Sequence, residues 1–313
     1  MKSLHLCLTY PKSTHFVLTL SLLLFASCVR QPVVEQTPPS GPPVLTFAVM
    51  GDVPYGLTPE EVESEKIILL EQISHLNENS AIEFVAHVGD IKKVLPPCEP
   101  DVYESVAEIL KASNHPLFII PGDNEWNDCT NPTEAWQFWE SNFMRFEENW
   151  THDLDVAHQP ERDENFAFIR NGVLFLGINL VGGKVHDWEE WQTRIEDDRR
   201  WLEVQFKKHS EEAFAAVIFA HANPGSILNK EFVYKKQALR PLIEYLDQTT
   251  SIDFPKPILF IHGDGHKWIA DLPFPNAGNR IARIQVTQGG LEAPLLVELR
   301  NDPTNPFYWI RNQ

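Results

Sequence analysis

The sequence predicts an α/β domain in which two β-sheets pack together and helices cover the outside. Three apolar runs, at 44–52, 82–90 and 116–123, each end in Gly-Asp. Apolar runs of this length that are rich in strand-forming residues and end at glycine are typical of strands buried on both faces. Helical patterns separate the three runs, and this β-α-β-α-β order implies a parallel sheet.

The first helix has a clear start signal. Thr58-Pro59-Glu60-Glu61 is a capping box with proline at the first helical position, and apolar residues follow at helical spacing. A second helix is expected over 101–113. Further helices are expected at 133–147, 187–208 and 231–247, and further strands at 165–180, 214–221, 257–263, 281–287 and 293–299. No fixed-period repeat and no second linker interrupt this pattern, so residues 44–313 are expected to form one domain.

Composition excludes several classes of protein. The chain has 313 residues, a formal net charge of −18, 43% hydrophobic and 22% charged residues, which are not the values of a disordered, collagen-like or coiled-coil chain. The acidic balance also argues against a nucleic-acid-binding surface, which needs clustered Lys and Arg, and against docking on anionic lipid through a basic surface.

The N-terminal segment has the pattern of a targeting signal. Residues 16–27 form an uncharged apolar run that is too short to cross a bilayer and suits a secretory signal peptide. Phe25-Ala26-Ser27-Cys28 resembles the bacterial lipoprotein box, so we expect a signal peptide over 1–27 and lipidation of Cys28. An ordinary signal peptide followed by an unrelated cysteine is the alternative.

Residues 28–43 then form a proline-rich linker that favours extended polyproline II. The domain is therefore expected in the bacterial cell envelope, held by its lipid anchor to a membrane and facing the periplasm or the outer surface. The sequence alone does not give the oligomeric state.

Two cysteines remain beyond the signal peptide and the lipidated residue. Cys98 and Cys129 are an even pair in an oxidising compartment, which predicts a disulfide. By chain entropy such a bond would add roughly 3–4 kcal/mol of stability. Two free buried thiols are the alternative.

Polar residues gather where the predicted strands end. Five strand ends carry Gly51-Asp52, Gly89-Asp90, Gly122-Asp123-Asn124-Glu125, His221-Ala222-Asn223-Pro224 and His262-Gly263-Asp264-Gly265-His266. The carboxyl ends of strands in an α/β sheet form the usual ligand site, and carboxylates with imidazoles on one rim suit a divalent metal ion.

In this order the motifs resemble those of the calcineurin-like metallophosphoesterases, over roughly residues 44–300. That family has Asp-x-His, Gly-Asp, Gly-Asn-His-Glu, His and Gly-His-x-His, each after a strand. The resemblance implies a two-sheet sandwich with four layers, α-β-β-α. It also implies hydrolysis of a phosphate mono- or diester by a hydroxide that bridges two divalent metal ions.

The resemblance assigns a role to each matching position. Asp52 and His266 would bind the first metal ion, Asp90 would bridge both ions, and Asp123, His221 and Asp264 would complete the site, with Asp264 in place of a histidine. These positions hold four carboxylates, and oxygen-rich ligand sets favour Mn²⁺, Mg²⁺ or iron over Zn²⁺.

Two departures from the family pattern concern catalysis. Pro54 stands where a histidine ligand is usual, with Tyr55 next to it, and Asn124 occupies the place of the histidine that assists the leaving group. Loss of such a group typically costs 10²–10⁴-fold in rate. Similar Gly-Asp-x-Pro-Tyr and Gly-Asp-Asn-Glu-Trp motifs occur in a bacterial subgroup of the family. We therefore expect Asn124 and His221 at the catalytic positions and Tyr55 near the ions or substrate.

Four further residues each have two interpretations. His87 either supports a ligand from behind or packs within a strand, and Lys92 either meets substrate phosphate or lies in a solvated loop. Asn179 either donates to substrate or caps a strand end, and His262 replaces Asp264 as a ligand if the local register differs.

The sequence thus predicts a lipid-anchored, metal-dependent phosphoesterase. A non-catalytic descendant that binds a metal ion or ligand on the same fold is the alternative favoured by Pro54 and Asn124. A scaffold lipoprotein, in which the acidic residues only shape turns, is a third hypothesis.

Overall fold

The computed structural model describes residue 36, residues 41–224 and residues 233–311, all within one compact unit, Gln31–Gln313. The predicted signal peptide and Cys28 lie outside the described residues. The α-helices are α1 (Pro59–Asn77), α2 (Pro100–Leu110), α3 (Pro132–Phe143), α4 (Trp188–His209), α6 (Val233–Glu244) and α7 (Thr250–Asp253). The strands are β1 (Leu45–Met50), β2 (Ile82–His87), β3 (Leu117–Ile119), β4 (Ala157–Gln159), β5 (Arg162–Arg170), β6 (Val173–Gly177), β7 (Ala215–Ala220), β8 (Ile258–His262), β9 (Ile269–Asp271), β10 (Ile281–Gln285), β11 (Leu295–Leu299) and β12 (Phe307–Ile310).

The strands form two sheets. One has the order β12-β11-β1-β2-β3, and the other β4-β5-β6-β7-β8-β10-β9. The β1, β2 and β3 strands are parallel, as the sequence predicts, and so are β6, β7, β8 and β10 in the second sheet. The polar motifs follow the carboxyl ends of β1, β2, β3, β7 and β8.

Side-chain alternation along β1 explains the layering. Phe47 and Val49 point into the core between the sheets, whereas Ala48 and Met50 pack under the helices on the other face. Because side chains alternate along a strand, a continuous apolar run can serve both faces of a sheet. Each of these four residues is almost fully buried.

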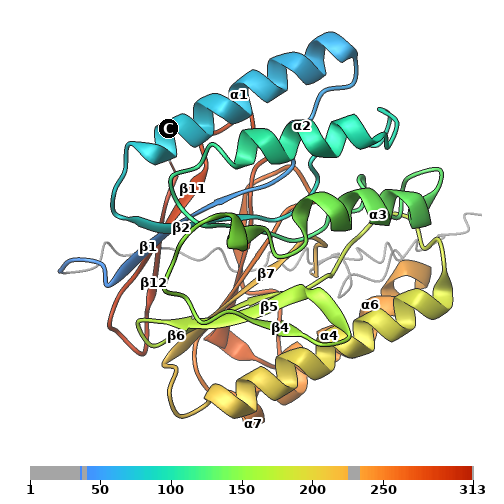
Figure 1. The fold of residues 1–313 in the computed structure, drawn as a ribbon. Coiled ribbons are helices and arrows are strands. Elements are labelled where there is room, and N and C mark those ends of the chain that lie inside the picture. The colour runs from blue at the N-terminus through green and yellow to red at the C-terminus, as the bar shows by residue number, and fades with distance from the viewer. Residues whose placement is uncertain (1–35, 37–40, 225–232, 312–313) are drawn as a thin grey trace, which may run out of the picture. The chain divides into compact units, whose positions relative to one another are not determined.

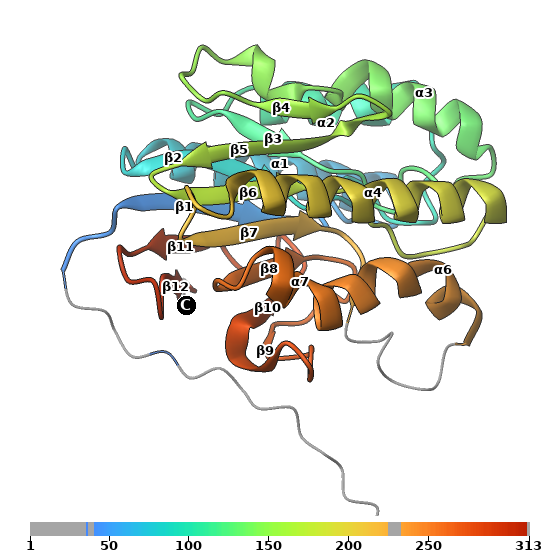
Figure 2. The same cartoon turned by 90° about the horizontal axis from the view of Figure 1, so that it is seen from below.

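Helices cover the outer face of each sheet (Figure 1). Helices α1, α2 and α3 pack on the five-stranded sheet, and α4, α6 and α7 pack on the seven-stranded sheet. Figure 2 shows the same arrangement from below. The predicted α/β sandwich with layers α-β-β-α is therefore confirmed.

The capping box of α1 also forms as predicted. The Glu61 amide donates to Thr58 Oγ1, and the Thr58 amide donates to the Glu61 carboxylate, both at 3.2 Å. Each bond satisfies an amide that has no partner within the helix, which explains why the helix begins here.

The prediction of a strand over 165–180 is wrong in detail, because this segment contains parts of two strands. Strands β5 and β6 form an antiparallel hairpin around Asn171-Gly172, where both residues have positive φ. Asn-Gly between apolar runs is the usual signal for such a turn. The sequence reasoning also missed the short strands β4, β9 and β12, each of which lies at a sheet edge.

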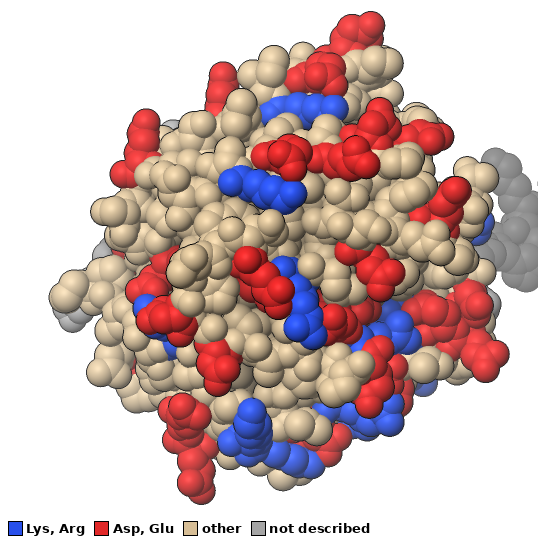
Figure 3. Space-filling view, in the orientation of Figure 1, with Lys and Arg blue, Asp and Glu red and all other residues tan. Residues whose placement is uncertain are grey.

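The described surface carries both signs of charge. On the face seen in Figure 3, Asp and Glu are interspersed with Lys and Arg. Among the helices in the described part of the chain, none is both long and apolar enough to cross a membrane.

Candidate metal centre at the strand ends

Two groups of potential metal ligands meet at the carboxyl ends of the parallel strands. Asp52, Asp90 and His221 form one group, and Asp123, His221 and Asp264 form the other. Within each group the ligand atoms lie within 4.8 Å of one another. The structure therefore brings together five of the six predicted ligands in two groups that share His221.

The shared histidine presents one nitrogen to both groups. Nδ1 of His221 lies 2.8 Å from the Val88 carbonyl oxygen, which can only accept, so Nδ1 carries the hydrogen. Nε2 lies 3.3 Å from Asp90 Oδ1 and 3.4 Å from Asp123 Oδ1. If a metal ion replaces the proton on Nε2, the Val88 carbonyl selects the tautomer whose Nε2 lone pair faces the carboxylates, as a metal ligand requires.

The surroundings of the Asp52 carboxylate indicate whether these residues fit a cation. Its side chain is fully buried, and neither carboxylate oxygen has a hydrogen-bond partner among the described residues. His266 Nε2 lies 3.2 Å from Asp52 Oδ1, which brings the sixth predicted ligand to the same place. Because a buried carboxylate without hydrogen bonds is costly, this arrangement fits a positive ion between the side chains.

Asp90 is held by the Asn124 side chain and main chain and by Tyr55. Asn124 donates to its carboxylate from the main-chain amide at 3.0 Å and from Nδ2 at 2.6 Å, and Tyr55 donates from Oη at 3.1 Å. Burial raises the pKa of Asp90 well above its usual range, and the nearby Asp123 carboxylate adds to this, although His221 opposes it. Metal ions at this position would instead stabilise the ionised carboxylate.

Asp264 shows the same effect in the second group. Burial and the neighbouring Asp123 carboxylate raise the pKa of Asp264 to about 6. Asp264 belongs to a ligand group and His262 does not. Nδ1 of His262 instead lies 2.8 Å from the Gly263 carbonyl oxygen.

The backbone is constrained at the candidate ligands. Of the six described non-glycine residues with positive φ, four are Asp52, Asp90, Asp264 and His266. Such conformations persist only where the surrounding structure enforces them, and they concentrate at functional sites.

Gly263 is needed for a different reason. A Cβ atom at this position would lie 2.6 Å from Asp52 Oδ2 and 3.3 Å from His221 Nδ1. Only glycine therefore lets the loop after β8 approach the ligands from the two sheets this closely.

Two of the predicted supporting residues lie behind the ligands. Nε2 of His87 faces the Val53 carbonyl oxygen at 3.2 Å, and Nδ1 accepts from the Gly89 amide, so neither nitrogen is free to bind an ion. Burial lowers the pKa of His87 to about 4, which keeps the ring neutral. Lys92 is also buried, and its ammonium group donates to the carbonyl oxygens of Lys93 and Asn124.

Sequence reasoning missed the role of Glu125. One oxygen of this fully buried carboxylate accepts from the Gly122 amide at 2.6 Å and from the Asp90 amide at 3.1 Å. Glu125 thereby ties the loop after β3 to the loop after β2. Its place at the end of the Gly122-Asp123-Asn124-Glu125 motif was the signal for it.

Asn179 lies in a buried polar network near the end of β6. Its amide nitrogens donate to Asn165 Oδ1 at 2.7 Å and to the Glu164 carboxylate at 2.8 Å, and Asn165 in turn donates to Asp198 at 2.6 Å. Burial raises the pKa of Asp198 to about 7. These contacts close the end of the strand, and none of them reaches a candidate metal ligand.

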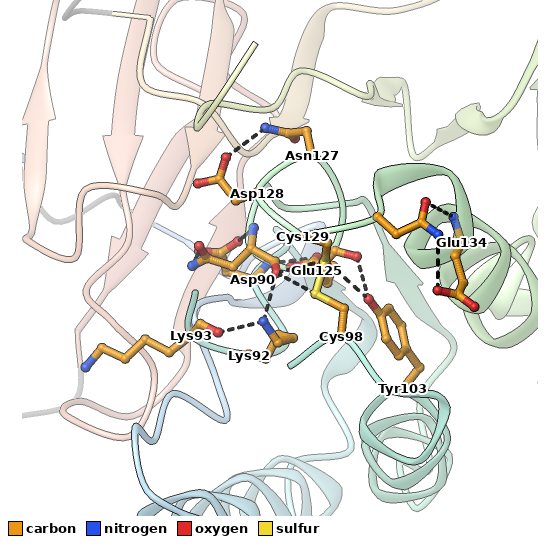
Figure 4. Close-up of a disulfide and its surroundings, with 12 residues drawn as sticks. Asp90, Lys92, Lys93, Cys98, Tyr103, Glu125, Asn127, Asp128, Cys129 and Glu134 are labelled. Carbon is orange, nitrogen blue, oxygen red and sulfur yellow. Dashed lines mark hydrogen bonds between the residues drawn. A yellow bond between two sulfur atoms is a disulfide. The ribbon is translucent and has the colours of Figure 1, made fainter. Parts of the chain in front are cut away.

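The predicted disulfide is confirmed beside the centre (Figure 4). Cys98 and Cys129 are bonded, with Cα atoms 6.0 Å apart, and both sulfurs lie 3.6 Å from the main-chain oxygen of Asn124. Tyr103 on α2 donates to the Glu125 carbonyl oxygen at 2.7 Å. The disulfide therefore links two loops, one of which carries Asn124.

Comparison with known proteins gives a likeness in structure but none in sequence. No family model matches the chain, and no curated protein matches it. GAP50, the anchor in the inner membrane complex of Plasmodium, superposes with a TM-score of 0.50 at 14% identity over 85% of this chain and 84% of that one. The two proteins share a fold. At this identity the likeness extends no further than the fold.

Two enzymes are also similar at lower scores. The 5′-nucleotidase precursor of Thermus thermophilus has a TM-score of 0.44 at 11% identity, covering 86% of this chain and 54% of that one. Purple acid phosphatase PPD1 from yellow lupin has a TM-score of 0.46 at 12% identity, covering 88% of this chain and 49% of that one. This chain thus spans about half the length of either enzyme.

Proposed function

We propose that this protein is a metal-dependent phosphoesterase that hydrolyses a phosphate mono- or diester. The observation that carries the proposal is the pair of ligand groups joined by His221, together with the fully buried carboxylate of Asp52 beside His266. Asp52, Asp90, Asp123, His221, Asp264 and His266 would hold two divalent ions. When bound, such ions supply Lewis-acid stabilisation of phosphoryl oxygens and activate water for attack.

Asn124 limits the chemistry available to the leaving group. Its side-chain amide donates to Asp90 and, at 2.7 Å, to Tyr55 Oη. A carboxamide has no titrating proton to transfer, so this residue positions its neighbours and does not act as a general acid. We therefore expect aryl esters, whose leaving groups depart without protonation, to react much faster than alkyl esters.

The test uses the purified protein with Mn²⁺ and matched aryl and alkyl phosphate esters. Asp90→Asn should remove turnover and lower the number of bound ions, whereas Asp101→Asn, at an exposed position on α2, should change neither. Circular dichroism and a melting curve establish that both variants are folded. Two bound ions without turnover of any ester would favour the non-catalytic alternative, and a wild type that binds no ion would refute both.

We further propose anchoring in the bacterial cell envelope through lipid on Cys28. The support is the sequence pattern of residues 16–28 and the proline-rich segment that follows. Cys28→Ala should shift the protein from the membrane fraction to the soluble fraction of cells, while Cys7→Ala should not. Membrane association that survives Cys28→Ala would contradict the lipid anchor.

A further inference from the structure

Tyr55 places a phenol oxygen among the candidate ligands. The side chain is 5% exposed, and its Oη lies 2.9 Å from His266 Nε2 and 3.1 Å from Asp90 Oδ2. On the other side of His266, Nε2 is 3.2 Å from Asp52 Oδ1. Four potential metal-binding atoms thus form a series in which each lies 2.9–3.2 Å from the next, in the order Asp52, His266, Tyr55 and Asp90.

This spacing matches neighbouring ligands on one ion. Two ligands that each lie about 2.1 Å from a metal ion at a right angle are separated by about 3.0 Å. The three separations in the series, from 2.9 to 3.2 Å, all agree with that value. Hydrogen-bonded atoms lie at similar distances. The two arrangements differ in which atoms still have a hydrogen to donate once an ion is present.

The hydrogen-bond inventory favours an ion at Tyr55. A histidine nitrogen that binds a metal ion has no hydrogen, so His266 Nε2 would then have nothing to donate to Tyr55 Oη. Asn124 Nδ2 donates to Oη at 2.7 Å and uses one of its lone pairs. A phenol oxygen has a second lone pair, which remains for an ion.

The ring of Tyr55 is also held in place from two sides. It packs edge-on against the His266 ring with centroids 4.8 Å apart, and Lys93 Nζ lies 5.1 Å from the ring centre. Ligation by a preplaced side chain costs little conformational entropy, because the rotamer is already selected.

We infer that Tyr55 is a direct ligand of one metal ion, together with Asp52 and His266. The inference rests on the proposed metal centre and adds a protein ligand to it. The resulting site has two oxygen ligands and one nitrogen ligand from this group of residues, a set suited to Mn²⁺ or iron.

The first test is calorimetric titration of the metal-free protein with Mn²⁺. We expect the wild type to bind two ions and Tyr55→Phe to bind one of them at least tenfold more weakly, with the other unchanged. Tyr245→Phe is the matched control, because its hydroxyl contacts Asp253 in the α6–α7 region and no candidate ligand. Equal affinities in the wild type and Tyr55→Phe would overturn the Tyr55 assignment while leaving the metal centre intact.

A second measurement separates ligation from hydrogen bonding to Asp90. A crystal structure of the Mn²⁺-loaded wild type, with the ions located by anomalous scattering, gives the distance from Oη to the nearest ion. A distance of about 2.0–2.4 Å supports ligation. An Oη beyond bonding distance overturns the inference, and a wild type that binds no ion overturns the proposed function along with it.

Discussion

Removing the disulfide should destabilise the protein by a calculable amount without disabling the metal centre. Cys98 and Cys129 are 31 positions apart, and closing a loop of that length lowers the entropy of the unfolded chain by an amount worth about 3.7 kcal/mol. For a domain of this size, roughly 2 °C is lost per kcal/mol, so the melting temperature should fall by about 7 °C. The double variant Cys98→Ser/Cys129→Ser removes the disulfide permanently.

The metal centre should tolerate the loss because other contacts hold the same loop. Asn124 keeps its hydrogen bonds to Asp90 and Tyr55, and its carbonyl oxygen still accepts from Lys92 at 3.0 Å. Mn²⁺ affinity in the double variant should therefore stay within about threefold of the wild type, since the crosslink acts mainly on the unfolded state.

Urea unfolding of the wild type, the reduced wild type and the double variant provides the assay. The reduced wild type should match the double variant in stability, and both should unfold with a steeper dependence on urea because their unfolded chains are less compact. Reductant should not affect the double variant, which makes it the control for side effects of the buffer. A stability loss below about 1 kcal/mol, or a large loss of Mn²⁺ affinity in a stable variant, would refute the reasoning.

Three other predictions concern the site, a buried acid and a helix cap. Gly263→Ala should weaken Mn²⁺ binding at least tenfold, because its Cβ would lie 2.6 Å from Asp52 Oδ2. Gly278→Ala, which strains the backbone at a φ of +61° but places its Cβ in open space, should leave Mn²⁺ binding unchanged. Asp198→Asn should gain stability relative to the wild type as pH rises from about 4 to about 7. In the folded wild type the pKa of Asp198 is raised to about 7, so its carboxyl group stays protonated up to that pH, whereas in the unfolded chain it loses the proton near pH 4. Between these two pH values the free energy of unfolding of the wild type therefore falls by up to about 4 kcal/mol. Thr58→Ala should cost about 1 kcal/mol of stability and leave Mn²⁺ affinity unchanged, because only the capping box is lost.

Calorimetric titration with Mn²⁺ checks the first of these, and urea unfolding checks the other two. Normal Mn²⁺ affinity in Gly263→Ala would show that the loop after β8 yields easily. A pH-independent difference between Asp198→Asn and the wild type would mean that the acid is ionised in the fold. Reduced Mn²⁺ affinity in Thr58→Ala would show that the start of α1 controls the position of Tyr55.

The local sequence determined the strands that carry the site. Buried runs that end in Gly-Asp predicted β1, β2 and β3, and the capping box predicted the start of α1, because these signals depend on neighbouring residues. The disulfide between Cys98 and Cys129 was also predictable, since only two cysteines remain once the N-terminal segment is set aside. The hairpin at Asn171-Gly172 was predictable in principle, and its turn signal was overlooked.

Tertiary structure alone decided how the side chains of the centre meet. Tyr55 and His266 are 211 positions apart, and their contact depends on two sheets presenting their strand ends at one rim. The same packing buries Lys92 behind the ligands and places Asn179 in a hydrogen-bond network with Glu164 and Asn165. Sequence spacing gives the order of such residues along the chain, but side-chain direction and burial arise only when the sheets pack face to face.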